Sequence, residues 1–364
     1  MVKFYSINKS DDIIKNKIIS SIKKVLYKNN FILGEEVFKF EKAFKKFCNA
    51  KFAISCSNGT DAITLALLAL DLPKNSEVII PAMTYASTFY AVINAKLKPV
   101  LVDINSDDPL INFELLKEKI NKNTRVIIPV HLYGSVVEIK KLRNIINSKK
   151  IYIIDDCAQA HGANYINGRM VGGHSISDIS TFSLYPGKNL GAYGDAGIIT
   201  TNNSKIYNKI IRIRNIGSIE KFNHETIGLN NRMDTIQAAI LIEKIKRLNF
   251  LNKKRKAIAN KYFSKIKNHK IKFLKYTKGS VFHQFVILVN NRNKFSKYLE
   301  HNNIEFGFHY PHSINQMNFF KKVFGNKVFK NAENLASKCI SIPIDPMLNN
   351  KEINYIIEKL NKFN

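Results

Sequence analysis

Residues 183–191 read Ser-Leu-Tyr-Pro-Gly-Lys-Asn-Leu-Gly and follow an apolar, strand-like run at residues 179–182. This stretch places one lysine, Lys188, in a glycine-rich turn directly after a strand. An amine in such a turn can form an imine with a carbonyl carbon when burial or nearby positive charge lowers its pKa. Because the chain has 57 Lys and Arg, a solvated surface charge is the ordinary interpretation of any one lysine. The assignment of Lys188 therefore depends on other segments.

A second segment has the pattern of an anion-binding turn. Residues 57–61 lie between a strand-like run at 52–56 and an apolar helical run at 62–70. A strand, a small-residue turn and a helix together direct backbone N–H groups towards a phosphate. Alternatively, Gly59 simply permits a turn, and Thr60 or Asp61 caps the helix. Neither Gly-x-x-x-x-Gly-Lys-Ser/Thr nor Gly-x-Gly-x-x-Gly occurs, so the standard nucleotide cradles are unsupported.

A third segment supplies a carboxylate. Residues 151–154 read as a buried strand that leads into Asp155 and Asp156, and open α/β sheets bind ligands at such strand ends. In a pyridoxal phosphate enzyme an aspartate must keep the pyridine nitrogen protonated, and Asp156 meets this need. Gln159 could reach the phenolic oxygen of the ring. The alternative is that the two aspartates cap the following segment.

In this order, the three segments resemble those of the sugar aminotransferases of the DegT/DnrJ/EryC1/StrS family, pyridoxal phosphate enzymes of the aspartate aminotransferase superfamily with fold type I. The similarity covers nearly the whole length. Its matching segments are residues 34–37, 40–41, 57–61, 81–88, 129–134, 155–163, 183–197, 230–234, 237–239 and 309–311.

The resemblance implies a role for each matched residue. Lys188 forms the Schiff base with the cofactor, Asp156 pairs with the pyridinium nitrogen, and Gln159 contacts the ring oxygen. Tyr85 stacks on the ring face. The implied phosphate-binding residues are Gly59, Thr60 and Asp61, mainly through backbone amides, with Ser183 and with Asn230 from the neighbouring subunit. The implied residues near the sugar are Tyr185, His309 and Tyr310.

The implied activity is transfer of the amino group of L-glutamate to a nucleotide-activated keto-sugar, which gives an amino sugar for surface polysaccharide or glycoconjugate synthesis. The family commonly reads Gly-Glu-Gly-Gly where this chain has Gly-Asp-Ala-Gly at residues 194–197. That variant is associated with members that aminate 3-keto sugars, so a dTDP-3-keto-6-deoxyhexose is the preferred acceptor. The resemblance also implies a homodimer with shared active sites.

Other functions stay open from the sequence. The acceptor could be a 4-keto-6-deoxyhexose or a UDP-2-acetamido-3-keto sugar. A sugar deoxygenase or dehydratase would release ammonia, but related dehydratases carry histidine at the position of Lys188. A regulatory or sensing module without turnover is the alternative of another class. The retention of Lys188, Asp156 and Gln159 argues against that alternative.

The carboxylate of the amino donor has no obvious partner in the C-terminal region. Amino-acid aminotransferases of this fold often bind it with a C-terminal arginine, whose planar fork a lysine copies poorly. After Arg292 this chain has no arginine, which suits a site enlarged for a sugar. Arg212, Arg214 and Lys221 are candidates for the pyrophosphate of the nucleotide. Exposed surface charge is an equally good interpretation of these three.

Composition limits the partners. The net charge of +29 attracts anions, but the lysines are scattered and no aromatic residues interleave them, so a specific nucleic-acid ligand is not expected.

No Cys-x-x-Cys spacing occurs among Cys48, Cys56, Cys157 and Cys339, so no metal site is predicted. The N-terminal segment begins with acidic Asp11 and Asp12 and has the pattern of an amphipathic helix, and no apolar run approaches the ~20 residues that span a bilayer. These features predict a soluble cytoplasmic protein without a membrane partner.

The resemblance and the alternation of strand-like and helical runs predict an α/β protein. We expect a large pyridoxal-phosphate-binding domain at 1–245, with a mainly parallel seven-stranded sheet sandwiched by helices, and a smaller C-terminal α+β domain at 246–364. Strands are predicted at 78–80, 99–103, 125–130, 151–154, 179–182 and 282–289. Helices are predicted at 86–95, 138–146, 292–301 and 350–360, with one long helix from 233 to about 265.

Overall fold

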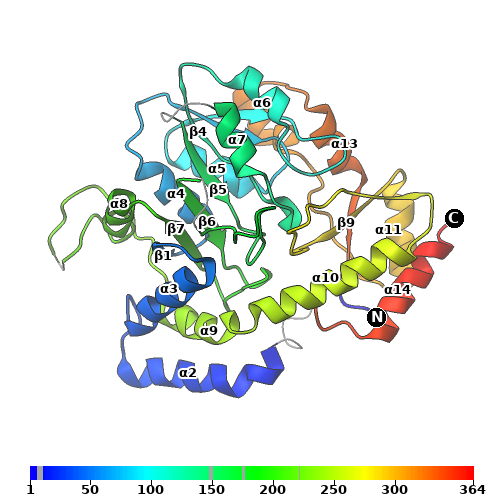
Figure 1. The fold of residues 1–364 in the computed structure, drawn as a ribbon, viewed down its shortest axis with the longest axis horizontal. Coiled ribbons are helices and arrows are strands. Elements are labelled where there is room, and N and C mark those ends of the chain that lie inside the picture. The colour runs from blue at the N-terminus through cyan, green and yellow to red at the C-terminus, as the bar shows by residue number, and fades with distance from the viewer. Residues whose placement is uncertain (6–10, 147–150, 174–176, 221) are drawn as a thin grey trace.

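The computed structural model describes residues 1–5, 11–146, 151–173, 177–220 and 222–364 (Figure 1). Its main sheet has seven strands in the order β1-β7-β6-β5-β4-β2-β3. β7 runs antiparallel to both of its neighbours, and every other adjacent pair is parallel. The predicted α/β class and mainly parallel sheet are therefore confirmed. The strands are β1 Phe52–Cys56, β2 Glu77–Pro81, β3 Lys98–Val102, β4 Thr124–Ile127, β5 Tyr152–Asp156, β6 Ile179–Ser183 and β7 Gly197–Thr201.

Helices cover both faces of this sheet. Successive strand residues point to opposite faces, so Ile153 joins one apolar cluster and Ile154 the other. Because both faces are buried, central strands such as β2 carry consecutive apolar residues, Val78 to Ile80, rather than a strict alternation. The Ile154 face is covered by α4 Gly59–Leu68, α5 Ala86–Asn94 and α8 Ser204–Arg214. The Ile153 face is covered by α3 Glu35–Cys48, α6 Phe113–Lys119, α7 Ile139–Ile146 and α9 Thr235–Ile245.

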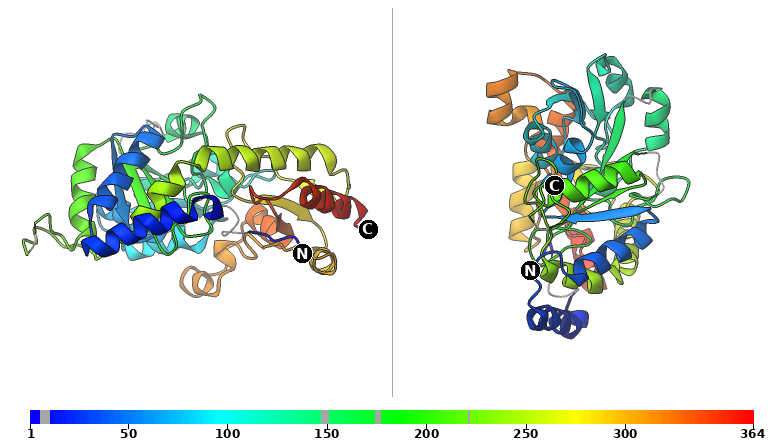
Figure 2. Two further views of the ribbon diagram at one scale, coloured as in Figure 1. Left: turned by 90° about the horizontal axis from the view of Figure 1, so that it is seen from below. Right: turned by 90° about the vertical axis from the view of Figure 1, so that its left-hand side faces the viewer.

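The C-terminal part has its own sheet and core. Figure 2 shows it at one end of the elongated molecule, with both chain termini. Its antiparallel sheet has the order β10-β9-β8, and Val2 from the N-terminus packs in the same core and pairs with Ile304. The division at residue 245 stays a prediction. The elements are α10 Leu248–Lys265, β8 Ile271–Phe273, β9 Phe285–Val289, α11 Arg292–His301, η3 Ile314–Gln316, α12 Asn318–Phe324, α13 Lys330–Lys338, β10 Cys339–Ile342 and α14 Asn350–Lys362.

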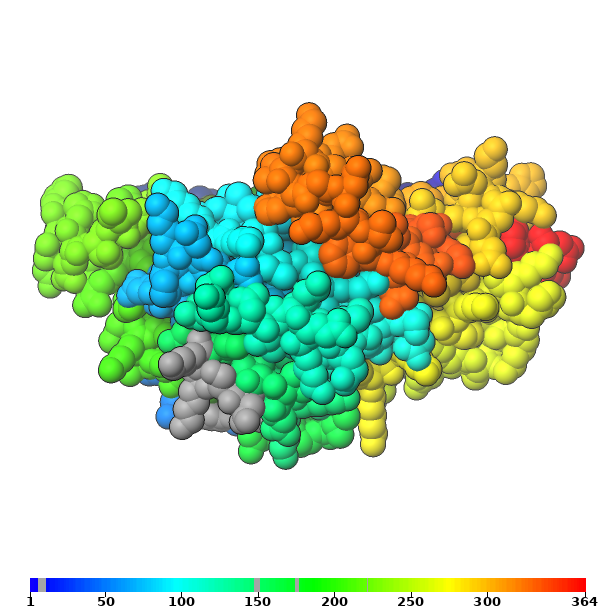
Figure 3. Space-filling view, turned by 90° about the horizontal axis from the view of Figure 1, so that it is seen from above, coloured from blue at the N-terminus to red at the C-terminus, as the bar shows by residue number. Residues whose placement is uncertain are grey.

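One segment of the C-terminal part is anchored on the large part. The ring of Phe89 on α5 lies 5.8 Å from the rings of both Phe320 and Phe324 on α12. Figure 3 shows the corresponding orange surface beside the cyan one. Aromatic contacts of this kind stabilise beyond the area they bury. They hold α12 of the C-terminal part against α5 of the large part.

Two predicted elements differ from the structure. The single helix expected from 233 to about 265 is wrong, because α9 ends at Ile245 and α10 begins at Leu248. Neither glycine nor proline marks this break. Ile245 and Leu248 are both buried in one cluster, so tertiary packing decides it. The strand expected from 282 begins only at Phe285, because Phe282 has φ of 48°, outside the range of a strand.

The N-terminal helix is confirmed as α2 Lys15–Lys28, which follows the short turn η1 Asp12–Ile14. Ile14 and Ile18 pack against Ile240 on α9. None of the helices in the described ranges combines the length and the apolar character needed to cross a bilayer.

Candidate active site

A cavity of about 830 Å³ opens where β5 and β6 end and where the helix α4 begins. Residues from both parts of the chain line it. Of the residues predicted for the site, those that line this cavity are Gly59, Thr60, Asp61, Tyr85, Asp156, Gln159, Ser183, Tyr185, Lys188, His309 and Tyr310. The sequence therefore located one site from segments as far apart as Gly59 and Tyr310, although the roles of these residues stay predictions.

Lys188 is held by a tight turn after β6. Its backbone N–H donates to the carbonyl of Tyr185 at 2.9 Å. Gly191 allows the turn to close, because a Cβ there would lie 2.4 Å from the carbonyl oxygen of Pro186. Burial lowers the pKa of Lys188 to about 8, and the negative charge of Asp156 acts in the opposite direction. A lysine with this pKa provides neutral, nucleophilic amine near neutral pH.

Asp156 is the last residue of β5, and both of its carboxylate oxygens accept hydrogen bonds. Thr88 Oγ1 donates to Oδ2 at 2.8 Å, and the N–H of Ala158 donates to Oδ1 at 3.1 Å. Thr84 and Thr88 hydroxyls share a further bond of 2.9 Å. Burial raises the pKa of Asp156, while these two donors and the charge of Lys188 favour its ionised form. Such a carboxylate can accept a hydrogen bond from a protonated ring nitrogen.

Gln159 is oriented by two partners. Its Oε1 accepts from the backbone N–H of Tyr133 at 2.6 Å, and its Nε2 donates to the hydroxyl of Tyr310 at 2.7 Å. Because Oε1 already accepts from Tyr133, Nε2 is the group of Gln159 that faces the cavity. Tyr85 lies 5.5 Å from the ring of Tyr310 and is 56% exposed. Tyr85 and Gln159 thus offer an aromatic face and an N–H donor to a flat ring.

The start of α4 forms a cradle for an anion. The Asn58 side chain caps the helix by accepting from the N–H of Asp61 at 2.9 Å. Within the described ranges, no protein acceptor takes the N–H of Gly59 or Thr60. A Cβ on residue 59 would lie 2.5 Å from Cβ of Ser183, so only glycine lets the two segments approach this closely. Amides at a helix N-terminus with adjacent hydroxyls suit a phosphate.

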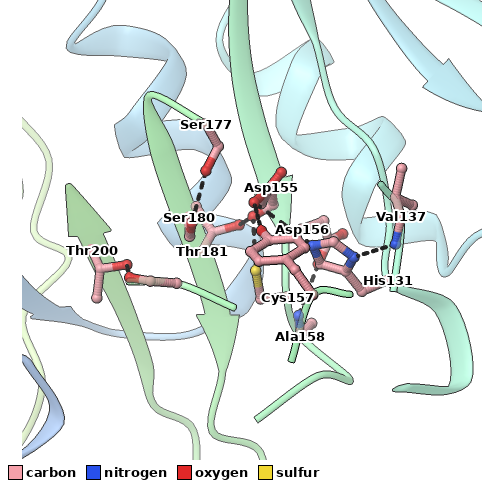
Figure 4. A network of polar contacts seen from close by, with 12 residues as sticks. His131, Val137, Asp155, Asp156, Cys157, Ala158, Ser177, Ser180, Thr181 and Thr200 are labelled. Atoms are coloured by element: carbon pink, nitrogen blue, oxygen red, sulfur yellow. Dashed lines mark hydrogen bonds and ion pairs between the residues drawn. The ribbon is translucent and has the colours of Figure 1, made fainter. Parts of the chain in front are cut away.

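A buried polar layer supports the strand end behind Asp156 (Figure 4). The N–H of His131 donates to the carbonyl of Asp156 at 3.0 Å, and the N–H of Val137 donates to Nδ1 of His131 at 3.0 Å. Tyr165 donates to Asp155 Oδ2 at 2.7 Å. Sequence reasoning assigned no role to His131 or Thr88, although both lie in segments that carried the resemblance. No residue-type pattern could have revealed contacts that are made across strands.

The opposite side of the cavity carries residues that the sequence analysis missed. His283 Nδ1 lies 3.0 Å from Oδ1 of Asn189, whose Nδ2 donates to Asn252 at 2.9 Å. The amide of Asn189 therefore presents its oxygen to His283, and the imidazole proton lies on Nδ1. Burial lowers the pKa of His309 to about 4, and the charge of Lys188 adds to this effect. Both imidazoles are neutral at pH 7.

Arg255 also lines the cavity and was missed. It lies on the buried face of α10, in the spacing of Leu251, Ile258 and Tyr262, where an apolar residue is expected. An arginine within an apolar helical stripe is a signal that the sequence did contain.

The pyrophosphate candidates on α8 have other partners. The prediction for Arg214 is wrong, because it is 3% exposed and bound to Glu41 at 2.6 Å, so the interpretation as an exposed charge also fails. Arg212 pairs with Glu225 at 2.8 Å. Lys221 lies outside the described residues. Asn230 does not line the cavity of its own chain, and its backbone pairs with Asn215.

Comparison with known proteins identifies the family. The model of the DegT/DnrJ/EryC1/StrS aminotransferase family matches residues 12–361. The chain belongs to this family. The resemblance seen in the sequence is thereby confirmed, and with it the assignment of the chain as an aminotransferase rather than a binding module.

Individual relatives of this family member are named sugar transaminases. The chain is 37% identical over its full length, and over 99% of the relative, to a dTDP-3-amino-3,6-dideoxy-alpha-D-galactopyranose transaminase of Aneurinibacillus thermoaerophilus. It is 32% identical to a UDP-2-acetamido-2-deoxy-3-oxo-D-glucuronate aminotransferase of Pseudomonas aeruginosa, with 99% of both chains covered. Among solved structures, DesV of S. venezuelae in complex with a ketimine intermediate superposes with a TM-score of 0.96, at 31% identity, with 99% of this chain and 98% of that chain covered.

Proposed function

We propose that this aminotransferase uses pyridoxal phosphate to move the amino group of L-glutamate onto a nucleotide-linked keto-sugar, preferably a dTDP-3-keto-6-deoxyhexose. The observation that carries this proposal is the joint presence of Lys188 and Asp156 in one cavity, with the pKa of Lys188 lowered to about 8. A buried amine of this kind serves imine chemistry, and a buried, hydrogen-bonded carboxylate serves a protonated ring nitrogen.

The residues of the cavity fit the cofactor. The free amides at the start of α4 and the close approach of Gly59 to Ser183 form a phosphate cradle. Asp156, Gln159 and Tyr85 offer a carboxylate, an N–H donor and an aromatic face. When bound, pyridoxal phosphate supplies an electron sink that stabilises negative charge on the carbon beside the transferred nitrogen.

Each protein group then has a defined task. Lys188 Nζ, neutral and released from its covalent bond, takes a proton from Cα of glutamate in the first half-reaction and runs this proton transfer in reverse in the second. The hydroxyl of Thr88 and the amide of Ala158 favour the ionised form of Asp156 against the effect of burial. Gln159 and Tyr310, joined at 2.7 Å, fix the hydrogen-bond direction at the ring oxygen.

The preference for a 3-keto acceptor has two supports. The names of the Aneurinibacillus and Pseudomonas relatives both place the amino or oxo group at carbon 3. Asp195, part of the Gly-Asp-Ala-Gly variant, lines the cavity. A UDP-2-acetamido-3-keto sugar stays an alternative, because the name of the Pseudomonas relative specifies such a sugar. A 4-keto-6-deoxyhexose also stays an alternative, with the amino group placed on carbon 4 instead of carbon 3.

A homodimer with shared sites belongs to the same proposal. The segment after α8 extends away from the body of the molecule (Figure 1) and exposes 84% of Phe222 and 94% of Ile227. Exposed apolar side chains of this size favour a protein partner. A second copy docked there would bring Asn230 towards its cavity. A cytoplasmic location is also proposed, where the four free cysteines would remain reduced.

The decisive experiment follows the two half-reactions separately. Purified enzyme loaded with pyridoxal phosphate is mixed with ¹⁵N-labelled L-glutamate, and loss of the imine absorbance is recorded. A panel of dTDP- and UDP-linked keto-sugars is then tested for restoring it, with the product identified by mass spectrometry. We expect ¹⁵N in the sugar. Release of ¹⁵N-ammonia would instead indicate a deoxygenase or dehydratase, and the absence of any response to glutamate would contradict transamination.

A further inference from the structure

One charged side chain of the cavity wall has a nitrogen from which no described residue accepts a hydrogen bond. Arg255 is only 5% exposed, and its Nη1 is buried without a hydrogen-bond partner. Across the described ranges, no hydrogen bond or ion pair joins Arg255 to another residue. A buried guanidinium nitrogen without an acceptor is costly, because it has lost its water and only the charges of Tyr5 and Asp345 act in its favour. Such a group in a cavity wall is expected to meet an anion that enters the cavity.

The neighbourhood of Arg255 places this anion near the reacting amine. Arg255, His283 and Lys188 all line the cavity. Burial lowers the pKa of His283, and the positive charges of Lys188 and Arg255 both lower it further, so both charges act on the same imidazole. Tyr5 and Asp345 also line this side of the cavity, and the charge of Asp345 partly offsets that of Arg255. Oδ1 of Asp345 accepts from the N–H of Met347 at 2.7 Å.

The phosphate of the cofactor has its own donors elsewhere. Gly59 and Thr60 at the start of α4, with Ser183 at the end of β6, form that cradle. Arg255 comes instead from α10, which belongs to the other part of the chain. The partner of Arg255 is therefore an anion of a substrate.

We propose that Arg255 binds the α-carboxylate of the amino donor and so selects an α-amino acid such as glutamate over a simple amine. This inference rests on the proposed function. In an α-amino acid, a carboxylate is attached directly to the carbon that bears the transferred nitrogen, so it must lie close to Lys188. In a nucleotide-linked 3-keto sugar, the diphosphate is attached two carbons away from the reacting carbon. The planar fork of arginine matches a carboxylate with two parallel hydrogen bonds.

The test measures binding and each half-reaction in holoenzyme variants. Arg255→Met removes the guanidinium but keeps the length of the side chain, and Arg255→Lys keeps the charge without the fork. Lys256→Met is the matched control, because Lys256 is exposed on the same helix and its loss lowers the net charge equally. Calorimetry with glutarate, which has no amine to react, reports carboxylate binding, and thymidine diphosphate reports nucleotide binding. Circular dichroism and thermal unfolding check that each variant is folded.

We expect the Kd for glutarate and the half-saturating glutamate concentration to rise about 30-fold in Arg255→Met, as for loss of a charged hydrogen-bonded pair. Arg255→Lys should recover part of this loss. Lys256→Met should change either value by less than about threefold, as for an exposed charge. Thymidine diphosphate should bind all variants alike. Should Arg255→Met not fold, Arg255→Lys decides, because it must still weaken glutarate binding.

Two results would overturn the inference. One is unchanged glutarate binding in the folded Arg255 variants. The other is a loss of thymidine diphosphate binding that equals the loss of glutarate binding, which would assign Arg255 to the nucleotide. Either result leaves the proposed function standing as long as wild-type enzyme responds to glutamate. Failure of the wild-type enzyme to respond would instead contradict the proposed function itself.

Discussion

The cavity has two walls that are built in different ways. The sheet wall consists of Gly59, Asp156, Ser183 and Lys188, which follow or end strands of the main sheet. The C-terminal wall comprises Arg255, His283, His309 and Tyr310, from α10 and the loops around the second sheet. The sheet wall combines local contacts, such as Asp156 with Ala158, with contacts between neighbouring elements, such as Thr88 with Asp156.

The C-terminal wall depends on contacts between distant segments. His283 meets Asn189 across 94 positions, and Gln159 meets Tyr310 across 151. The sheet wall holds groups that any reaction of this cofactor requires. The C-terminal wall holds groups that can distinguish one substrate from another. Substitutions should therefore abolish chemistry on the sheet wall and alter binding or selectivity on the C-terminal wall.

The largest effect is expected for Lys188→Ala. Without the amine there is neither a covalent attachment nor a proton carrier, so turnover should fall by at least about ten thousand-fold. Borohydride reduction and peptide mapping should label residue 188 in the wild-type enzyme and no lysine in the variant. A label at another lysine of the loaded wild-type enzyme would contradict the assignment.

Asp156→Asn should come next, with a loss of about a thousand-fold in the rate of the glutamate half-reaction, because the ring nitrogen loses its ionised partner. Thr88→Val should give a smaller loss of the same kind, since it removes one donor to that carboxylate. Thr88→Ser, which keeps the hydroxyl, is the matched control. Near-normal rates in Asp156→Asn would refute its role.

The pKa of Lys188 predicts a pH dependence for loading. Only the neutral amine attacks the aldehyde, so the rate of imine formation in cofactor-free protein should rise about tenfold per pH unit below pH 8 and level off above it. With a lysine of ordinary pKa, the rate of imine formation would keep rising to about pH 10. The charge of Asp156 raises the pKa of Lys188, so Asp156→Asn should shift the midpoint to lower pH. Stopped-flow absorbance measures this.

Gly59→Ala should weaken cofactor binding by about tenfold, because the new Cβ would lie 2.5 Å from Cβ of Ser183 and force the cradle apart. Equilibrium dialysis of pyridoxal phosphate provides the measurement. Gly168→Ala is a control outside the cavity: no atom lies within 4 Å of its Cβ position, and its φ of +79° makes the substitution costly to stability but not to cofactor affinity. Equal affinity in Gly59→Ala and wild type would show that the cradle is not where the phosphate binds.

The smallest effect is expected on the C-terminal wall for Tyr310→Phe. It removes the hydroxyl that accepts from Gln159 at 2.7 Å and should lower the rate by about threefold to tenfold. His309→Gln should change the half-saturating concentration of the sugar rather than the glutamate half-reaction. If both variants abolished turnover as Lys188→Ala does, the distinction between the two walls would be lost.

Much of the sheet wall could be predicted because its residues are close in sequence to the strand ends that place them. Lys188 after an apolar run, Asp156 at a strand end and Gly59 before a helix each carry a local pattern, and all three line one cavity. Arg214 was misjudged because nothing local shows its bond to Glu41, 173 positions away. Arg255 was missed because its place in the apolar stripe of α10 shows that it is buried but not that it faces the cavity.

The sequence by itself determined the α/β class, the alternation of strands and helices in the large part and the three segments that meet at the strand ends. Strand patterns and turn residues act through nearest neighbours, so they can be read along the chain. Only the tertiary structure decided that α9 and α10 separate after Ile245, that Thr88 holds Asp156 and that Nη1 of Arg255 is buried without an acceptor among the described residues. Burial and desolvation are properties of the packed molecule, and these set the pKa values and the unpaired charge on which the chemistry depends.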